Sequence, residues 1–330
     1  MNTPVMSLDS LRIDTRATAA WIEDWIRETI YKRIRRKGVV IALSGGIDSS
    51  VVATLCARAL GPQRVLGLYM PETDSSADSL RLGRVLADTL GISTVLEDIT
   101  PVLRALGCYA RRDEAIRSVV PDYGEGYKSK IVLPSALEPP EYAIFSVVVQ
   151  SPTGEQIKAR LTAAAYLGIV AATNFKQRTR KTLEYYHADR LQYAVAGTPN
   201  RLEFELGFFV KNGDGSADLK PIAHLYKTQV YQLAKYLGVP AEIRSRAPTT
   251  DTYSLQQSQE EFYFSVPLEH MDLCLYARDH QIPVTAVAGA IGMTPQQVAR
   301  VFAGIDSKRN VTRYLRSEPL HPEAEFSSAT

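Results

Sequence analysis

Residues 39–50, Val39-Val40-Ile41-Ala42-Leu43-Ser44-Gly45-Gly46-Ile47-Asp48-Ser49-Ser50, decide the fold. The first five are apolar and mostly β-branched, which is typical of a short strand buried on both faces. The two glycines break this run, and Ser49 to Leu60 then favours a helix that Gly61-Pro62 ends. The stretch therefore predicts a buried strand, a tight turn and the start of a helix.

The same alternation continues on both sides of this stretch. Residues 14–36 carry apolar side chains at helical spacing, and residues 79–90 favour another helix. Residues 65–70 and 94–96 have the composition of strands. Strands that alternate with helices indicate an α/β fold, with a doubly wound parallel sheet covered by helices on both faces.

Residues 107–157 interrupt this alternation. Val119 to Gly126 is rich in turn-forming residues, and three strand-like runs follow at residues 130–133, 145–149 and 156–160. We interpret the region as a β-rich insertion in the α/β fold.

The alternation resumes after the insertion. Residues 162–187 favour a helix with an interruption near Asn174, and Leu191 to Ala196 favours a buried strand that ends at Gly197-Thr198. Further helices are expected at residues 225–237, 267–279 and 294–303. We expect one domain over residues 1–317 and a loose C-terminal tail over residues 318–330, where the chain becomes rich in Pro, Ser and Glu.

Composition excludes several classes of protein. With 45% hydrophobic and 22% charged residues, the 330-residue chain has the balance of a globular protein. A net charge of +2 gives no signal for nucleic acid or an acidic membrane, and no apolar run is long enough to span a bilayer. The three cysteines, Cys56, Cys108 and Cys274, form no CxxC pair, which fits a reducing compartment. We therefore expect a cytoplasmic protein.

The loop from Ser44 to Ser50 has the composition of a pyrophosphate cradle. Gly45 and Gly46 let the backbone turn tightly and approach a ligand, and the helix that follows presents unpaired N–H groups. Hydroxyl donors are added by Ser44, Ser49 and Ser50. Asp48 places a carboxylate beside the phosphates, where Mg²⁺ is its natural partner. The structural alternative is a glycine turn capped by serine and aspartate.

This loop resembles the PP-loop of the N-type ATP pyrophosphatases, which split ATP between its α and β phosphates and adenylate a substrate. The fold that this resemblance implies is adenine nucleotide alpha hydrolase-like. Further blocks resemble the NAD synthetases of that superfamily, occur in the same order and cover about residues 20–315. These blocks are Asn174–Arg180, Gly197–Glu203, Gly207–Leu219, His224–Gln229, Ala247–Asp251 and Lys308-Arg309.

The resemblance implies catalytic and metal-binding roles for five residues. Asp48 and Glu203 would bind Mg²⁺, and Lys227 would touch a phosphate of ATP. Lys211 and Asp214 would contact the activated nicotinate or help to position ammonia. Cations are needed because the substrate carboxylate must approach the α-phosphate, which is also anionic.

The same blocks imply binding roles for further polar residues. Arg178 would hold part of deamido-NAD. Thr198 and Thr249 are expected to contact nucleotide or phosphate. Substrate contacts are also expected for Asn174, Asp218 and Lys308.

The function that the resemblance implies is the amidation of deamido-NAD to NAD, with ATP as co-substrate and AMP and pyrophosphate as products. Two alternatives stay open. One is a PP-loop amide ligase that acts on another nucleotide-linked or specialised carboxylate. The other is a nucleotide-binding module without catalytic activity. The family also implies a homodimer.

The expected nitrogen donor is free ammonia. A glutaminase with an N-terminal nucleophile needs cysteine directly after Met1, and this chain has Asn2. The short segment before the PP-loop leaves no room for a nitrilase-type glutaminase domain. A separate glutaminase partner could still supply ammonia.

Overall fold

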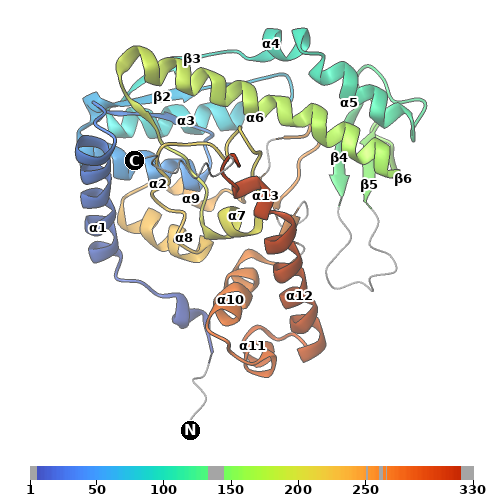
Figure 1. Ribbon diagram of the computed structural model, residues 1–330. Helices are drawn as coiled ribbons and strands as arrows, with labels where there is room; N and C mark the ends of the chain where they lie inside the picture. Colours follow the sequence, from blue (N-terminus) through green and yellow to red (C-terminus); the bar gives the residue numbers. More distant parts are fainter. Residues whose placement is uncertain (1–5, 133–144, 250–251, 260–262, 265, 321–330) are drawn as a thin grey trace, which may run out of the picture.

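A four-stranded parallel sheet forms the centre of the fold in the computed structural model, which describes residues 6–132, 145–249, 252–259, 263–264 and 266–320. The strand order is β3-β2-β1-β7 (Figure 1). The strands are β1 (Val39–Ala42), β2 (Val65–Tyr69), β3 (Ser93–Leu96) and β7 (Ala194–Val195). Val39 of β1 pairs with Val65 on one side and with Ala194 on the other. The predicted α/β fold with a parallel sheet is confirmed.

Helices cover both faces of this sheet. Val39 and Ile41 of β1 lie in one core, which α1 (Thr15–Glu28), α2 (Ile47–Leu60) and α8 (Lys227–Tyr236) complete. Val40, between them, points into the core on the opposite face. That second core involves α4 (Thr100–Ala105) and α6 (Ala163–Leu191). Because successive side chains of a strand face opposite ways, the uninterrupted apolar run follows from burial on both faces.

The inserted region contains both helix and sheet. It begins with α5 (Cys108–Arg117), and three antiparallel strands follow as β4 (Lys128–Val132), β5 (Ser146–Gln150) and β6 (Gln156–Arg160). The predicted strands are confirmed, whereas the helix in the first part of the insertion was not predicted. Figure 1 shows α6 running from the main sheet to this second sheet. α5 packs along α6, which explains why residues 108–117 become helical.

Two predictions around α6 are also wrong. The helix continues without a break through Asn174, because packing of α6 against α5 outweighs the low helix propensity of one asparagine. α6 ends only at Leu191, and Gln192 takes a left-handed conformation with φ +57°. The strand expected from Leu191 therefore shortens to two residues, β7.

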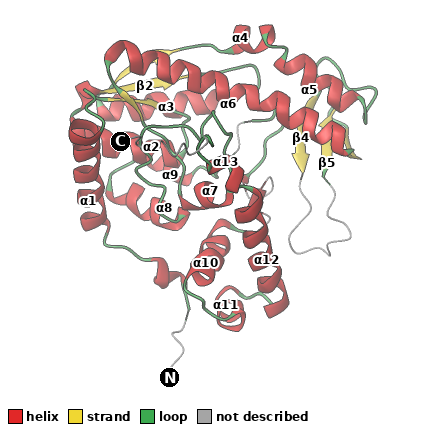
Figure 2. Cartoon of the chain, in the orientation of Figure 1, coloured by secondary structure: helices red, strands yellow, loops and turns green. Residues whose placement is uncertain are grey.

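The C-terminal third is helical (Figure 2). Besides α8, the helices from residue 201 onward are α7 (Arg201–Leu206), α9 (Ala241–Ser245), α10 (Leu268–Asp279), α11 (Val284–Ile291), α12 (Pro295–Val311) and α13 (Arg313–Arg316). Helices α7, α10, α11 and α12 share a core with Met6 and Leu11. The helices expected at residues 225–237, 267–279 and 294–303 are confirmed, whereas α11 was not predicted.

The remaining elements are three short helical segments and one full helix. They are η1 (Leu8–Leu11), η2 (Thr29–Arg33), η3 (Pro62–Arg64) and α3 (Ala77–Leu90), of which only α3 exceeds five residues. The segment expected to be a loose tail is described as far as Leu320, which is 98% exposed, and residues 321–330 lie outside the described part. Within the described residues, no helix is both long and apolar enough to cross a membrane.

Candidate active site

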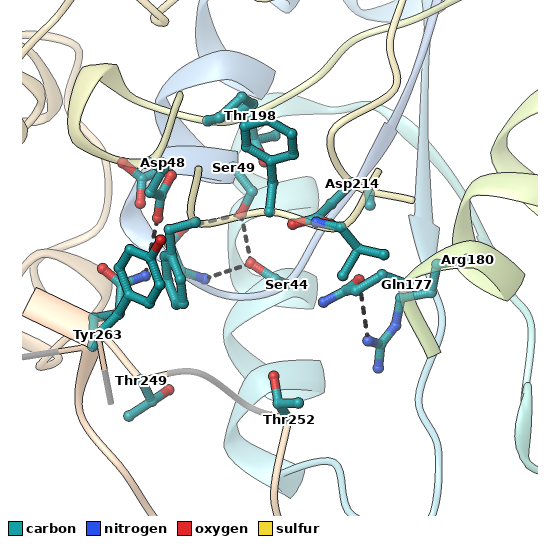
Figure 3. Close-up of a pocket in the computed structure, with 18 of the residues that line it drawn as sticks. Ser44, Asp48, Ser49, Gln177, Arg180, Thr198, Asp214, Thr249, Thr252 and Tyr263 are labelled. Atoms are coloured by element: carbon teal, nitrogen blue, oxygen red, sulfur yellow. Dashed lines mark hydrogen bonds between the residues drawn. The ribbon is translucent and has the colours of Figure 1, made fainter. Parts of the chain in front are cut away.

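A cavity of about 920 Å³ opens at the carboxyl ends of β1, β2 and β7. This is the edge at which open parallel sheets bind ligands. Its wall combines the glycine loop after β1, the loop after β2, the polar face of α6 and the segment after β7. Figure 3 shows Ser44 and Asp48 on one side of it, and Asp214, Gln177 and Arg180 on the other.

The glycine loop takes a conformation that requires glycine. Gly45 has φ +71°, and a Cβ placed there would lie 2.4 Å from Ser79 O. Ser44 Oγ and Ser49 Oγ lie 3.0 Å apart, and both residues line the cavity with Gly46. The loop is therefore shaped to present polar groups to a ligand at the start of α2.

Two loop residues predicted to bind ATP do not line this cavity. Ser50 is fully buried, and its hydroxyl donates to Gly46 O at 2.8 Å. Gly45 lies behind the wall, against Ser79. Both residues therefore shape the loop. The Ser50 hydroxyl bonds to the backbone of the loop, and Gly45 allows the loop to pack against Ser79.

Asp48 and Lys227 meet in the cavity wall. Asp48 lies in the first turn of α2, and Lys227 begins α8. Lys227 is 1% exposed, and its Nζ donates to Asp48 Oδ2. The other carboxylate oxygen of Asp48 accepts a hydrogen bond from Asn200 Nδ2 at 3.1 Å. Both oxygens are therefore oriented by the protein.

Glu203 is held beside this pair by the first turn of α7. Asn200 caps the helix: its Oδ1 accepts from Glu203 N at 3.2 Å, while Glu203 Oε2 accepts from Asn200 N at 3.1 Å. Asn200 thus contacts both Asp48 and Glu203. Sequence reasoning missed Asn200, although the spacing N-x-x-E after a strand is the signature of a reciprocal helix cap.

The electrostatics favour a further cation at this point. Burial, together with the charge of Asp48, raises the pKa of Glu203 to about 8, and Lys227 only partly opposes this effect. Burial alone would lower the pKa of Lys227, but Asp48 and Glu203 more than compensate and raise it. One buried ammonium thus stands against two carboxylates. An additional positive charge would stabilise both in the ionised form.

The carboxylate pair fits a cation that takes most of its ligands from elsewhere. The described residues hold no group of three or more His, Cys, Asp or Glu side chains placed to bind a metal. Mg²⁺ is commonly held by one or two carboxylates, with phosphate oxygens and water completing its shell. Asp48 and Glu203 both line the cavity and satisfy that requirement.

The opposite wall carries three of the predicted substrate residues. Arg178 Nε donates to Lys211 O at 3.3 Å, and Lys211 Nζ donates to Tyr314 O at 2.8 Å. Asp214 closes the turn that follows α7, because its Oδ1 accepts from Val210 N at 2.8 Å. Burial raises the pKa of Asp214. Arg178, Lys211 and Asp214 all line the cavity, as do the predicted Asn174, Thr198 and Thr249.

Lys308 reaches the same cavity from α12. Its Nζ donates to Tyr263 O and lies 4.3 Å from the centre of the Tyr263 ring. Burial lowers the pKa of Lys308 to about 8. Its neighbour in the predicted Lys308-Arg309 block has other partners: Arg309 forms ion pairs with Glu205 and Asp279.

Asp218 does not lie on the cavity wall. Its Oδ2 accepts from Val195 N at 2.8 Å, and its Oδ1 accepts from Tyr185 Oη at 3.4 Å. β7 is an edge strand, so Asp218 satisfies a backbone group that no neighbouring strand can reach. The geometry gives no support to its predicted contact with substrate.

Several cavity residues escaped sequence reasoning. Arg246 donates to Ser79 Oγ at 3.1 Å, and Gln259 donates to Glu203 Oε1 at 3.0 Å. On α6, Lys181 and Glu184 form a buried ion pair of 2.7 Å, one turn beyond Arg178. The helical spacing from Arg178 could have indicated these two, but Arg246 and Gln259 lie in irregular backbone.

Thr250 and Asp251, the last two residues of the predicted block Ala247–Asp251, lie outside the described residues.

A parallel sheet, a glycine turn onto a helix and a buried lysine paired with Asp48 at the sheet edge fit the PP-loop class of ATP pyrophosphatases. The chain resembles one family of that class along nearly its whole length. The family model of NAD synthase matches residues 18–120 and 148–317, and the chain belongs to that family. It is accordingly a ligase that forms a carbon–nitrogen bond.

Individual relatives agree with this assignment. The chain is 59% identical to the NH(3)-dependent NAD(+) synthetase of Mesorhizobium japonicum, over 94% of this chain and 97% of the relative. It is 57% identical to the protein of the same name from Rhizobium meliloti, over 96% and 95%. The predicted resemblance to ammonia-dependent NAD synthetases is confirmed.

Solved structures share the fold. The NH3-dependent NAD synthetase from Campylobacter jejuni aligns with a TM-score of 0.61 at 23% identity, covering 94% of this chain and all of that one. The NMN synthetase from Francisella tularensis aligns with a TM-score of 0.66 at 22% identity, covering 95% and 100%.

Proposed function

We propose that this enzyme converts deamido-NAD to NAD with ATP and ammonia, and releases AMP and pyrophosphate. The observation that carries the proposal is the contact of Lys227 with Asp48, beside Glu203, in a cavity that Arg178 and Lys211 also line. Such a cavity offers a phosphate site and an acceptor site in one space. The curated relatives aligned over nearly the full chain carry the name of this activity.

The first step is adenylation. A carboxylate oxygen of the nicotinate attacks the α-phosphorus of ATP, and the bond from that phosphorus to the bridging oxygen of pyrophosphate breaks. Nucleophile and target are both anionic, so their approach requires positive charge that is already in place. Lys227 is buried, ionised and fixed by Asp48, which spares it reorganisation during the reaction.

The second step is amide formation. Ammonia attacks the acyl carbon of the adenylate, the carbon–oxygen bond to AMP breaks, and the surplus proton leaves to solvent or a base. The enzyme contributes position and charge to this step without covalent chemistry of its own. We assign Lys211 and Asp214 to the acceptor side, because both line the cavity and Figure 3 shows Asp214 on the side of Gln177 and Arg180.

Asp48 and Glu203 would hold Mg²⁺, with ATP phosphate oxygens as its other ligands. Bound there, the ion would offset the charge on the phosphates and on the pyrophosphate leaving group. The raised pKa of Glu203 supports this assignment, because a carboxyl that is hard to ionise alone becomes ionised when a divalent cation joins it.

We also propose that the enzyme is a homodimer in the cytoplasm. α6 exposes Leu167 at 63% and Tyr186 at 59%, so this long helix offers apolar contacts to a second copy. A closed two-fold dimer is the commonest symmetric assembly. Light scattering of the active enzyme should give twice the 36.5 kDa mass of the chain, and a monomer mass would exclude this proposal.

The deciding assay combines purified enzyme, ATP, Mg²⁺ and one acceptor with either ammonium or ammonia-free glutamine. Deamido-NAD with ammonium should yield NAD, AMP and pyrophosphate in equal amounts, whereas glutamine should give little product. Nicotinic acid mononucleotide, which lacks the adenylate half, tests the alternative of a related ligase. Preference for that acceptor, or ATP binding without pyrophosphate release, would refute the proposal.

A further inference from the structure

Gln259 lies on the cavity wall beside Glu203 and is 8% exposed. Its Nε2 donates to Glu203 Oε1 at 3.0 Å. Its backbone is fixed as well, because Gln259 N donates to Pro248 O at 3.1 Å, and a β-bridge joins Thr249 to Ser258. The side chain is therefore held at the carboxylate by its own backbone segment.

The other end of this amide is a buried acceptor. Gln259 Oε1 is inaccessible to solvent and accepts no hydrogen bond from the described residues. Once Glu203 is ionised, reversing the amide would place this oxygen against its carboxylate, and two acceptors repel each other. The orientation is thus fixed by Glu203, and the carbonyl oxygen is left to a ligand.

The neighbouring carboxylates need such an oxygen. Asp48 already accepts hydrogen bonds on both oxygens, from Asn200 and Lys227. Glu203 likewise accepts on both, from Asn200 N and from Gln259. A divalent cation between Asp48 and Glu203 would therefore find only part of their lone pairs free. A neutral amide oxygen adds a ligand without adding a third negative charge.

We propose that Gln259 is the third residue of the cation site, a role that rests on the proposed function of Asp48 and Glu203. Its Nε2 positions the Glu203 carboxylate, and its Oε1 supplies a neutral oxygen to the cation. Gln259 is thereby a positioning residue and a metal ligand for the adenylation step.

The test measures metal binding rather than turnover. Mn²⁺ replaces Mg²⁺, and electron paramagnetic resonance reports free Mn²⁺ during titration of the full chain with α,β-methylene-ATP, which cannot react. Gln259→Leu removes donor and acceptor, whereas Gln259→Glu keeps an oxygen in the same place. Groups that orient metal ligands typically change metal affinity 10- to 100-fold. We expect Gln259→Leu to weaken Mn²⁺ binding about tenfold or more, and Gln259→Glu, which keeps the oxygen but loses the donor to Glu203, to bind more tightly than Gln259→Leu.

Gln257 provides a matched control two residues away. It is 3% exposed, its Nε2 donates to Ile131 O, and its Oε1 is likewise buried without a partner among the described residues. Gln257 lies outside the cavity wall, however. Gln257→Leu should cost comparable thermal stability and leave Mn²⁺ affinity unchanged.

The outcomes separate the two proposals. Failure of the unmodified enzyme to bind Mn²⁺ with the ATP analogue would refute the cation site itself and, with it, the proposed adenylation. Binding by the unmodified enzyme with Gln259→Leu within twofold of it would refute only the role of Gln259. Gln259→Glu as weak as Gln259→Leu would also refute that role, because a positioned oxygen would then not matter.

Discussion

Lys227 and Asp48 stand 179 positions apart in the sequence, yet Lys227 Nζ donates a hydrogen bond to Oδ2 of Asp48. The two residues begin helices α8 and α2, which pack against each other under the sheet edge. Their contact fixes a buried positive charge at the end of the glycine loop. The hydrogen bond thus connects the glycine loop in the first half of the chain with α8 in the second half.

Loss of the Lys227 ammonium should slow adenylation more than it weakens the binding of ATP. Removing one preorganised group that stabilises charge in a transition state costs about 100- to 1,000-fold in kcat. We expect Lys227→Met to lower the rate of pyrophosphate–ATP exchange in this range. Lys235→Met is the matched control, because Lys235 lies on the exposed side of the same helix. Equal rates in the two variants would contradict a catalytic role for Lys227.

Neutralising Glu203 should weaken the binding of Mg²⁺ and slow adenylation. Glu203→Gln keeps the shape of the side chain and the cap on α7, but removes one negative ligand. We expect a fall in adenylation rate of roughly 100-fold or more, and a rise in the Mg²⁺ concentration for half-maximal rate. Chelating the metal from the unmodified enzyme should give the same low rate. Glu269→Gln, on the exposed start of α10, should change neither quantity.

Substitutions at Gly45 and Gly91 distinguish the cost of backbone strain from the cost of a steric clash. Both have positive φ, +71° and +65°, but a Cβ at Gly45 would lie 2.4 Å from Ser79 O, whereas none of the described atoms lies within 4 Å at Gly91. Left-handed backbone costs about 1–2 kcal/mol for a residue with a side chain. We expect Gly91→Ala to lose about that much stability and to keep ATP binding. Gly45→Ala should lose more stability and bind ATP more weakly, as calorimetry would show. Equal effects on both would argue against a packed loop.

The buried Lys308 predicts a pH dependence of stability. Its folded pKa of about 8 lies below the ordinary value of 10.5, so the folded state binds the proton more weakly than the unfolded state. The charged form is therefore penalised below pH 8, and the penalty disappears as pH rises toward 10.5.

Lys308→Met should consequently gain stability relative to the unmodified enzyme at pH 7, and this advantage should shrink between pH 8 and 10 by about 1 to 3 kcal/mol. Urea unfolding at several pH values measures the difference. Lys32→Met, at an exposed lysine, should show no such trend. A difference that stays constant with pH would contradict burial of the Lys308 amine.

The local pattern of the chain predicted most of the regular structure and half of the site. The strands that begin near residues 39, 65 and 94 could be predicted, because short runs rich in β-branched residues favour strands. The unbroken course of α6 could not be predicted, because the polar residues in its middle resemble a helix end. Only the contacts of α6 with α5 and with the cavity show that the helix continues. The same holds for residues 108–117, where packing on α6 decides the helix.

By itself, the sequence determined the glycine loop, the α/β alternation and the identity of the charged residues, since these depend on local backbone preference and on chemical type. The tertiary structure alone decided which charges meet. It brought Asn200 between Asp48 and Glu203 and placed Gln259 against Glu203, while Asp218 was turned to the edge of β7. The contacts of Asn200 with Asp48, of Gln259 with Glu203 and of Asp218 with Val195 join segments from 23 to 152 positions apart. Over such separations helical or strand periodicity carries no information. Only the packing of α2, α7 and the segment after α9 around one sheet edge fixes them.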